Sequence, residues 1–225
     1  MSTHHEEEEI NIGEAYNTAE NFLDQNKQSI GIALAAIVIV VLGAFYYFNM
    51  YLPPLKKSAS EDVYAAQKAF AADSFELAMN GSAEFMGFEE IIDNYGSTEI
   101  GNTSKYYMGI SLMHTRSYED AIDYLNSYSA NDHITRALKE GAIGDCLSQL
   151  GEFEDAISAY KKAANAYKNE FSTPIYLKKA GITAEKINDY ESAVEFYETI
   201  NKEYSNTTEA RDIDKYLAHA KSFVQ

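Results

Sequence analysis

Three short stretches decide the fold: YEDAI at residues 118–122, FEDAI at 153–157 and YESAV at 190–194. They begin 35 and then 37 residues apart, so the chain repeats a unit of nearly constant length. Each stretch carries an aromatic residue first and a small residue fourth. A repeat of this length predicts a stack of supersecondary units in which each unit packs only against its neighbours.

Two further positions repeat together with these stretches. A glycine stands twelve residues before each alanine, and a large side chain, Leu125, Tyr160 or Tyr197, stands four residues after it. Small residues on both helices of a hairpin let the helix axes come close, and the large side chain fills the remaining gap. The residues predicted to make these close contacts are Gly109, Ala121, Gly144, Ala156, Gly181 and Ala193.

This pattern resembles the tetratricopeptide repeat, a helix-turn-helix unit of about 34 residues. The resemblance covers residues 102–207 and implies an all-α helical solenoid with repeats at 102–135, 137–170 and 174–207. The chain departs from the family pattern at the first-helix tryptophan, because Lys105, Glu140 and Leu177 take its place. Residues 88–92 resemble a degenerate earlier repeat. Residues 208–224 resemble the terminal capping helix that such stacks need.

A second decisive stretch, residues 29–48, contains twenty residues and no charge. A helix of that length spans about 30 Å, the thickness of a bilayer's hydrocarbon core. Pro53 and Pro54 follow and are expected to end the helix just outside the membrane. A buried core helix is the first alternative, which the length opposes, and a cleaved signal peptide is the second, which the acidic start at Glu6 to Glu9 opposes.

These features divide the chain into four parts. The predicted parts are an acidic tail with a short amphipathic helix (1–28), a single N-terminal transmembrane helix (29–49), a juxtamembrane linker (50–57) and a tetratricopeptide-repeat domain (58–225). Two helices are expected ahead of the clear repeats, over residues 58–80 and 83–94, with Ser60 as a cap of the first.

The charge balance limits the partners. The net charge is −17, and residues 29–225 alone hold 28 acidic and 17 basic side chains. Nucleic acid is not expected as a partner, since binding it requires clustered lysine and arginine. The lipid bilayer is the partner that the apolar span predicts.

The usual motifs of catalysis are missing from the sequence. It contains no glycine-rich phosphate loop, no His-Glu-x-x-His motif and no pair of cysteines, so we expect no catalytic residue, cofactor, metal site or small-molecule substrate. Cys146 lies two residues after Gly144 on a first helix, a position that favours a buried thiol over a nucleophile. His114, His133 and His219 are scattered over separate hairpins and suggest surface or capping roles.

Repeat stacks of this kind offer a groove lined by the first helix of each hairpin. The residues predicted to form a partner-binding groove are Tyr106, Ile110, Met113, Asp145, Ser148, Gln149, Lys178, Ile182 and Lys186. They mix apolar and polar side chains, which suits protein binding. An alternative for Tyr106 and Met113 is packing against the preceding hairpin. The lysine and asparagine clamp of carboxylate-binding cochaperones is not matched.

The outline of acidic tail, single span and small repeat domain resembles the YfgM-like bacterial inner-membrane proteins, as does FLDQNK at 22–27. The resemblance implies an ancillary subunit of a SecYEG-type translocon that works beside a membrane-anchored isomerase-like chaperone. It also implies a cytoplasmic N-terminus and a periplasmic repeat domain. The lysines oppose this orientation, because Lys56, Lys57 and Lys68 follow the span and only Lys27 precedes it, although long domains translocate largely regardless of charge.

A second function fits the same groove: a scaffold for envelope assembly or cell division. An enzyme is the third class, and no motif in the sequence favours it.

Overall fold

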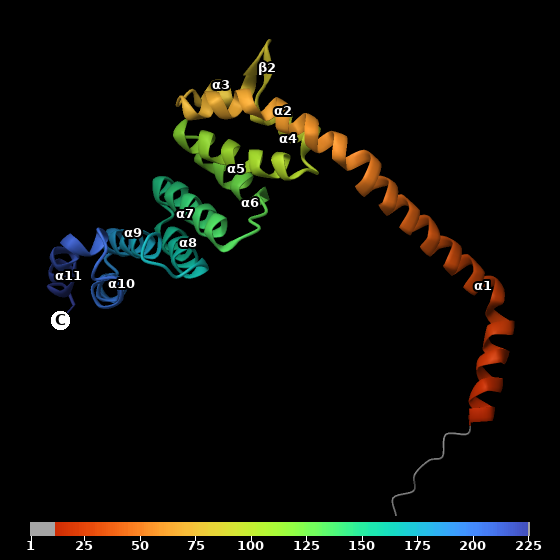
Figure 1. Cartoon of the computed structure of the whole chain (residues 1–225). Coiled ribbons are helices and arrows are strands. Elements are labelled where there is room, and N and C mark those ends of the chain that lie inside the picture. Colours follow the sequence, from red (N-terminus) through yellow and green to blue (C-terminus); the bar gives the residue numbers. More distant parts are fainter. Residues whose placement is uncertain (1–11, 225) are drawn as a thin grey trace, which may run out of the picture. The chain divides into compact units, whose positions relative to one another are not determined.

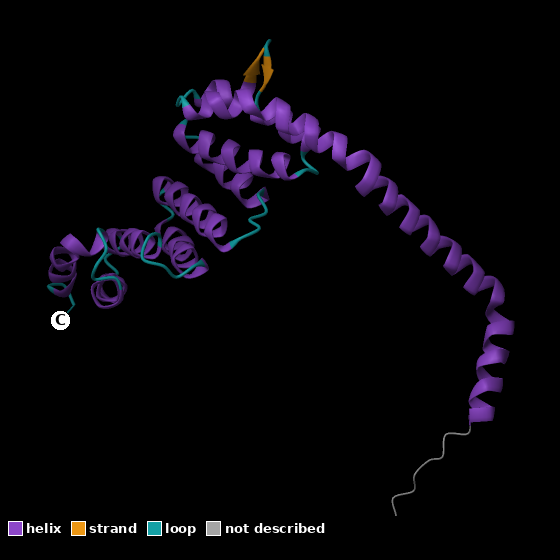
Figure 2. Cartoon of the chain, viewed as in Figure 1, coloured by secondary structure: helices purple, strands orange, loops and turns teal. Residues whose placement is uncertain are grey.

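The computed structural model describes residues 12–224, and their side chains from residue 20. Helices make up almost all of this part of the chain, and one short pair of strands interrupts them (Figure 2). The chain divides into two compact units, residues 1–54 and 55–225. The acidic residues at the start of the predicted tail lie outside the described residues.

The first unit is dominated by one uninterrupted helix, α1 (Ile12–Tyr46), which covers both the predicted tail helix and most of the predicted span. A π-helix, η1 (Tyr47–Tyr51), follows it directly. The apolar side chains of α1 are exposed, with Ile39 at 70% and Val40 at 69%. Among the described residues, the helical run Glu20–Ala71 is the one long and apolar enough to cross a membrane by length and composition, criteria that a signal sequence or a soluble helix can also meet.

The expectation that Pro53 and Pro54 end the helix is wrong. Helical structure continues as α2 (Leu52–Ala71), so residues 50–57 are helical and Ser60 lies inside a helix rather than at its cap. Proline inside a helix lacks the N–H that would donate to the carbonyl oxygen four residues earlier, and helices are often irregular at such a position. The π-helix just before the prolines accommodates the interrupted hydrogen-bond pattern.

The region before the clear repeats also differs from the expectation of helices over 58–80 and 83–94. The first helix breaks after Ala71, where Asp73 adopts a φ of 55°, and a new helix, α3 (Phe75–Asn80), begins. A two-stranded antiparallel hairpin, β1 (Gly81–Ser82) and β2 (Phe85–Met86), replaces the start of the second. The helix that follows the hairpin, α4 (Phe88–Tyr95), is shorter than the helix expected over residues 83–94.

The glycines that bracket the hairpin explain its position. Gly81 has a φ of 71°, which favours glycine, and a Cβ on it would collide with the backbone at Phe85 and Gly87. A Cβ on Gly87 would collide with the Met79 carbonyl oxygen. The two chain segments therefore cross too closely for any side chain.

Three helical hairpins and a terminal helix complete the second unit (Figure 1). The elements are α5 (Glu99–His114) with α6 (Tyr118–Ser127), α7 (His133–Leu150) with α8 (Phe153–Ala166), α9 (Thr173–Lys186) with α10 (Tyr190–Glu203), the 3-10 helix η2 (Glu209–Asp212), and α11 (Ile213–Lys221). An aromatic residue begins each of α4, α6, α8 and α10. Residues 88–92 thus occupy the place in their helix that YEDAI, FEDAI and YESAV occupy in theirs.

Glycine and a large residue meet inside every hairpin. A Cβ on Gly109 would lie 2.7 Å from Leu125 Cγ, and one on Gly144 would lie 2.6 Å from Tyr160 Cε1. Gly181 faces the Tyr197 ring in the same way. Ala121, Ala156 and Ala193 have no exposed surface. The hairpins are therefore packed so tightly that no side chain larger than hydrogen fits at these glycines.

The last helix covers the open end of the stack. Ile213 and Ala220 on α11 are fully buried, and Tyr216 and Leu217 pack against the same cluster, which contains Tyr197. One face of α11 thus hides the apolar side of α10, as a repeat stack requires at its end.

Candidate protein-interaction site

Four of the predicted groove residues lie together in an open depression of about 300 Å³. We call it the Asp145 depression. Its lining residues come from α5, α6, α7 and α8 and are Met113, Tyr118, Asp145, Ser148, Gln149 and Tyr160. Apolar, aromatic and polar groups all face this space. The combination suits a protein segment better than a small polar metabolite.

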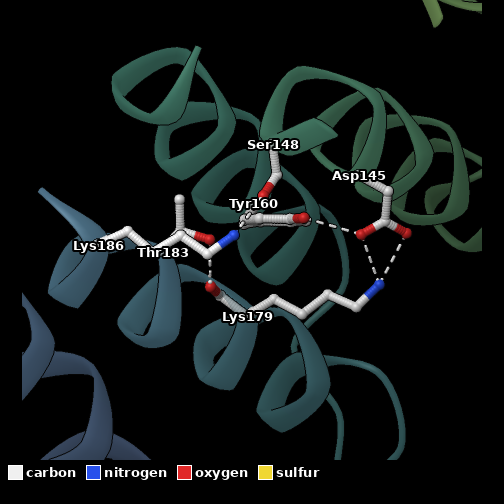
Figure 3. Close-up of polar contacts among 6 residues, drawn as sticks. All are labelled: Asp145, Ser148, Tyr160, Lys179, Thr183 and Lys186. Carbon is white, nitrogen blue, oxygen red and sulfur yellow. Dashed lines mark hydrogen bonds and ion pairs between the residues drawn. The ribbon is translucent and has the colours of Figure 1, made fainter. Parts of the chain in front are cut away.

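Asp145 is the polar centre of this depression (Figure 3). Tyr160 Oη donates a hydrogen bond of 2.8 Å to Asp145 Oδ1, and Lys179 Nζ lies 2.7 Å from both carboxylate oxygens. Tyr160 comes from α8 and Lys179 from α9, so one carboxylate on α7 ties three helices together. The charge of Asp145 is balanced within the protein.

Lys186 is the last residue of α9, and its side chain lies on the opposite side of Tyr160 from Asp145. Its Nζ donates a 3.4 Å hydrogen bond to Ser148 Oγ and lies 5.0 Å from the centre of the Phe153 ring. No carboxylate among the described residues pairs with Lys186. The depression therefore contains one balanced ion pair, and beside it lies an exposed lysine whose ammonium group contacts Ser148.

Burial changes the protonation chemistry of two groups here. It raises the pKa of Tyr160, and the charge of Asp145 raises it further, so the phenol stays a donor at any physiological pH. Burial, then Asp145, raise the pKa of the Cys146 thiol to about 11, and its side chain is fully buried. A thiol with this pKa is a poor nucleophile. Among residues 20–224, whose side chains the structure describes, no group of histidine, cysteine and acidic side chains could bind a metal ion.

Two other predicted groove residues, Lys178 and Ile182, line a second depression of about 480 Å³, the Lys178 depression, between α9 and η2. Lys178 Nζ lies 2.6 Å from Asp212 Oδ1 and 4.8 Å from the centre of the Tyr216 ring. This hydrogen bond lowers the pKa of Asp212. Lys178 is thus bound to the end of the stack and is not a free charge at a rim.

Tyr106 and Ile110 line neither depression. Tyr106 is half-buried, its ring centre lies 5.5 Å from that of Tyr128, and burial raises its pKa. Ile110 packs on the cluster that contains Leu125 and Ile143. Tyr106 is therefore a packing residue, as the alternative to the groove predicted. It packs against Tyr128 in the loop after its own hairpin and not against the preceding hairpin. Met113 takes both roles, since it packs on the first core cluster and lines the Asp145 depression.

Sequence reasoning missed Lys179 and Asp212 and treated Tyr160 as a packing residue only. A signal was present: Asp145 and Lys179 lie 34 residues apart, as do Lys178 and Asp212. One repeat length separates each pair, so opposite charges at this offset stand on neighbouring helices of the stack.

Comparison with known proteins agrees with this architecture. A protein-family model described as soluble NSF attachment protein, SNAP, matches residues 56–217. The chain belongs to this family. The match begins within α2, covers α3, α4 and all three helical hairpins, and ends within the terminal helix α11. SNAP-family and tetratricopeptide-like repeat proteins are typically scaffolds without enzymatic activity.

Two solved structures have the same fold as this SNAP-family chain. A crystal structure of MamA aligns with a TM-score of 0.51 at 17% identity and covers 71% of this chain and 94% of MamA. A second MamA crystal structure gives a TM-score of 0.52 at 16% identity, covering 76% and 88%. At these identities the likeness concerns the fold alone. None of the curated proteins compared with the chain matches it in sequence.

Proposed function

We propose that this SNAP-family chain is a membrane-anchored scaffold that binds a protein partner through the Asp145 depression. The observation that carries the proposal is the depression itself. It places Met113 and Tyr118 beside polar groups that are still open to solvent, namely Ser148, Gln149 and Lys186. Large side chains with a polar surround are what a partner's anchor residue contacts at an interface centre.

The exposed apolar face of α1 supports the anchor. None of its most apolar stretch is buried in the protein, and the side chains of Ile32, Ile39 and Val40 are each more than 60% exposed. Exposed apolar surface of this extent is unfavourable in water and is matched by the hydrocarbon core of a bilayer. The aromatic residues Tyr47 and Tyr51, stacked at 5.7 Å in η1, suit the headgroup level at the end of the span.

The partner class follows from two resemblances. The family name SNAP describes attachment to a second protein, NSF, which agrees with a scaffold. The YfgM-like outline of tail, span and repeats supports a finer proposal: an ancillary subunit of a SecYEG-type translocon, beside a membrane-anchored isomerase-like chaperone. Envelope assembly or cell division is the second candidate, and the mixed apolar and polar depression serves it equally.

The proposed orientation has the N-terminus in the cytoplasm and the repeat domain in the periplasm of a bacterial inner membrane. Protease added to spheroplasts should then digest the repeat domain. Full protection of the domain until the inner membrane is permeabilised would reverse the orientation and remove the translocon proposal.

Partner recovery from crosslinked membranes tests the depression. Changing Gln149→Glu and Lys186→Glu together adds a negative charge at the first position and reverses a positive charge at the second, and both positions are exposed and outside the core. We expect recovery of the partner to fall about tenfold, because both new carboxylates would lose their hydration when a partner covers them. The matched control changes Lys162→Glu and Asn165→Glu, which are exposed on α8 and line a different depression.

Both variants should melt at the temperature of the unmodified chain. Equal recovery from all three proteins would mean that the partner binds elsewhere and would end the proposal. The identity of the recovered proteins separates the finer candidates: translocon subunits support the first and envelope-assembly proteins the second. Tyr106 and Ile110 are poor positions for this test, because both are half-buried and their loss would disturb the fold.

A further inference from the structure

The helical run through η1 contains a point at which backbone acceptors outnumber backbone donors. In an α-helix each carbonyl oxygen accepts from the N–H four residues later, and in a π-helix it accepts from the N–H five residues later. Pro53 and Pro54 lie in the first turn of α2, just after η1, and neither has an N–H. The carbonyl groups that would use those two donors therefore lie within η1.

Asn49 is the residue most affected. Pro53 stands four residues after it and Pro54 five, so the Asn49 carbonyl oxygen has no backbone donor in either helical pattern. The Asn49 side chain does not supply one, because its Nδ2 donates to the Phe45 carbonyl oxygen at 3.0 Å. The Asn49 carbonyl group needs a donor from outside the helix.

The carbonyl groups on either side are affected in part. Phe48 loses its π-helical donor to the first proline, and its α-helical donor would be Leu52, whose N–H bonds to the Tyr47 carbonyl oxygen instead. Met50 loses its α-helical donor to the second proline. We call the carbonyl groups of Phe48, Asn49 and Met50 the η1 carbonyl groups. They are consecutive, so they point in different directions around the helix.

The surroundings of the η1 carbonyl groups select for a donor. Residues 28–55 contain no charged side chain and no histidine, so no ionic group of the chain lies beside these oxygens in the sequence. No residue of η1 is buried, and the side chains of Phe48 and Met50 are 62% and 64% exposed. A molecule that approaches meets hydrogen-bond acceptors without a neighbouring cation, which favours a positively charged donor over an anion.

The position of η1 at the end of the apolar span determines which donors are present. Tyr46, Tyr47 and Tyr51 mark this end as the headgroup level of the proposed anchor. Hydrocarbon offers no donor to a carbonyl group, whereas the headgroup level offers water and the ammonium groups of phospholipids. A hydrogen bond from a charged donor is about twice as strong as one between neutral groups, so the ammonium group is favoured over water.

From this count of donors and acceptors we propose that the η1 carbonyl groups bind the primary ammonium group of a phospholipid headgroup, as found in phosphatidylethanolamine. A primary ammonium carries N–H donors for such oxygens. The choline headgroup carries the same charge without any N–H and is a poor ligand for them. The proposal rests on the membrane anchor proposed above and adds a class of lipid to it.

Native mass spectrometry of the full chain tests this preference. The chain is purified in detergent and exposed to equal amounts of phosphatidylethanolamine and phosphatidylcholine with the same acyl chains, and the lipids that it retains are counted. We expect phosphatidylethanolamine to be retained about threefold more often, because its ammonium group alone donates hydrogen bonds.

Restoring the missing donors is the sharpest variant. Pro53→Ala and Pro54→Ala together return N–H groups to the helix, and alanine keeps the run helical because it is the best helix former. The ratio of the two retained lipids should then fall to about one. The matched control, Leu52→Ala, shortens a neighbouring side chain and leaves both prolines in place, so it should keep the preference. Circular dichroism should show the same helical content for all three proteins.

Two results would overturn the proposal: equal retention of the two lipids by the unmodified chain, or an undiminished preference in the double alanine variant. Extraction of membranes with alkaline carbonate separates this proposal from the anchor. If the chain stays in the membrane fraction and retains both lipids equally, the lipid site alone is wrong. Release of the chain into the soluble fraction would remove the anchor and the lipid site with it.

Discussion

The second and third hairpins pack in the same way and then place the same tyrosine hydroxyl in different surroundings. In both, a tyrosine ring lies against a glycine on the first helix, Tyr160 on Gly144 and Tyr197 on Gly181. In the second hairpin, Tyr160 Oη donates to Asp145 at the edge of an open depression. In the third, α11 covers Tyr197, and Tyr197 Oη and the nearby Glu185 Oε1 are both buried without a partner within hydrogen-bond geometry among the described residues.

The difference shows how a repeat separates fold from function. The contact between the tyrosine ring and the glycine belongs to the fold and recurs in both hairpins. The surroundings of the tyrosine hydroxyl differ, because they depend on which helix packs next in the stack. In the interior of the stack the tyrosine hydroxyl lies at the edge of the open Asp145 depression. At the end of the stack the capping helix closes the same position, and the charge of Glu185, after burial, raises the pKa of Tyr197.

The largest predicted effect tests the shared contact. Gly144→Val and Gly181→Val should each lower the free energy of unfolding by roughly 3 kcal/mol, since the added methyl groups would enter a tyrosine ring. In a chain of this size such a loss lowers the melting temperature by about 6–12 °C, measured by circular dichroism of the full chain. Ser158→Val, at an exposed position on α8, is the control and should change the midpoint little. An unchanged midpoint for Gly144→Val would mean that the hairpin contact is not as close as described.

A smaller effect separates the two hairpins. Tyr160→Phe removes a hydrogen bond to a carboxylate and should cost about 1.5–2 kcal/mol of stability. Tyr197→Phe removes a buried hydroxyl that has no described partner, and it should be neutral or stabilising. Midpoints of denaturant unfolding, measured on the full chain at one pH, distinguish the two. Equal losses would show that Tyr197 is hydrogen-bonded in the folded state and that the contrast between the hairpins is not real.

Much of this fold can be predicted from spacing because helix geometry is regular. The glycine, the alanine and the large residue lie at fixed offsets, so their contact depends only on the hairpin and not on the rest of the protein. The break between α2 and α3 cannot be predicted from spacing. It depends on one aspartate, Asp73, in a left-handed conformation, and no glycine or proline stands there to indicate a turn. Pro53 and Pro54 mislead for a different reason: proline usually interrupts a helix in its interior, whereas here the π-helix η1 lies directly before the prolines and the helical run continues.

The candidate site is predictable in part for a related reason. The first-helix positions of Met113, Asp145 and Ser148 follow from the repeat register, and the structure places all three in one depression. Which side chains neutralise Asp145 depends on the approach of the next hairpin, 34 residues later. The repeat pattern gives no signal for the apolar pocket of Ile134, Tyr167 and Phe171 between α7 and the loop joining α8 to α9, because the conformation of that loop depends on the hydrogen bonds of Asn169.

The smallest predicted effect concerns the ion pairs that join neighbouring helices, one at the second hairpin and one at the terminal helix. Lys179 joins α9 to α7 through Asp145, and Lys221 joins α11 to α10 through Glu198, each at 2.7 Å. Lys202 also donates to Glu198, at 2.8 Å, and the hydrogen bonds from Lys202 and Lys221 lower the pKa of Glu198 to about 2.

Because this pKa is lower in the folded chain than in the unfolded one, the contribution of Glu198 to stability is complete above about pH 4.5 and is lost as the pH falls toward 2. Glu198→Gln should therefore lower the melting temperature slightly at pH 7, and the difference from the unmodified chain should shrink steadily below about pH 4.5. Glu195→Gln, an exposed change on the same helix, is the control and should show no such dependence. A difference that stays constant from pH 7 to pH 3 would mean that Glu198 acts through packing, and that α11 is held on the stack by its apolar face alone.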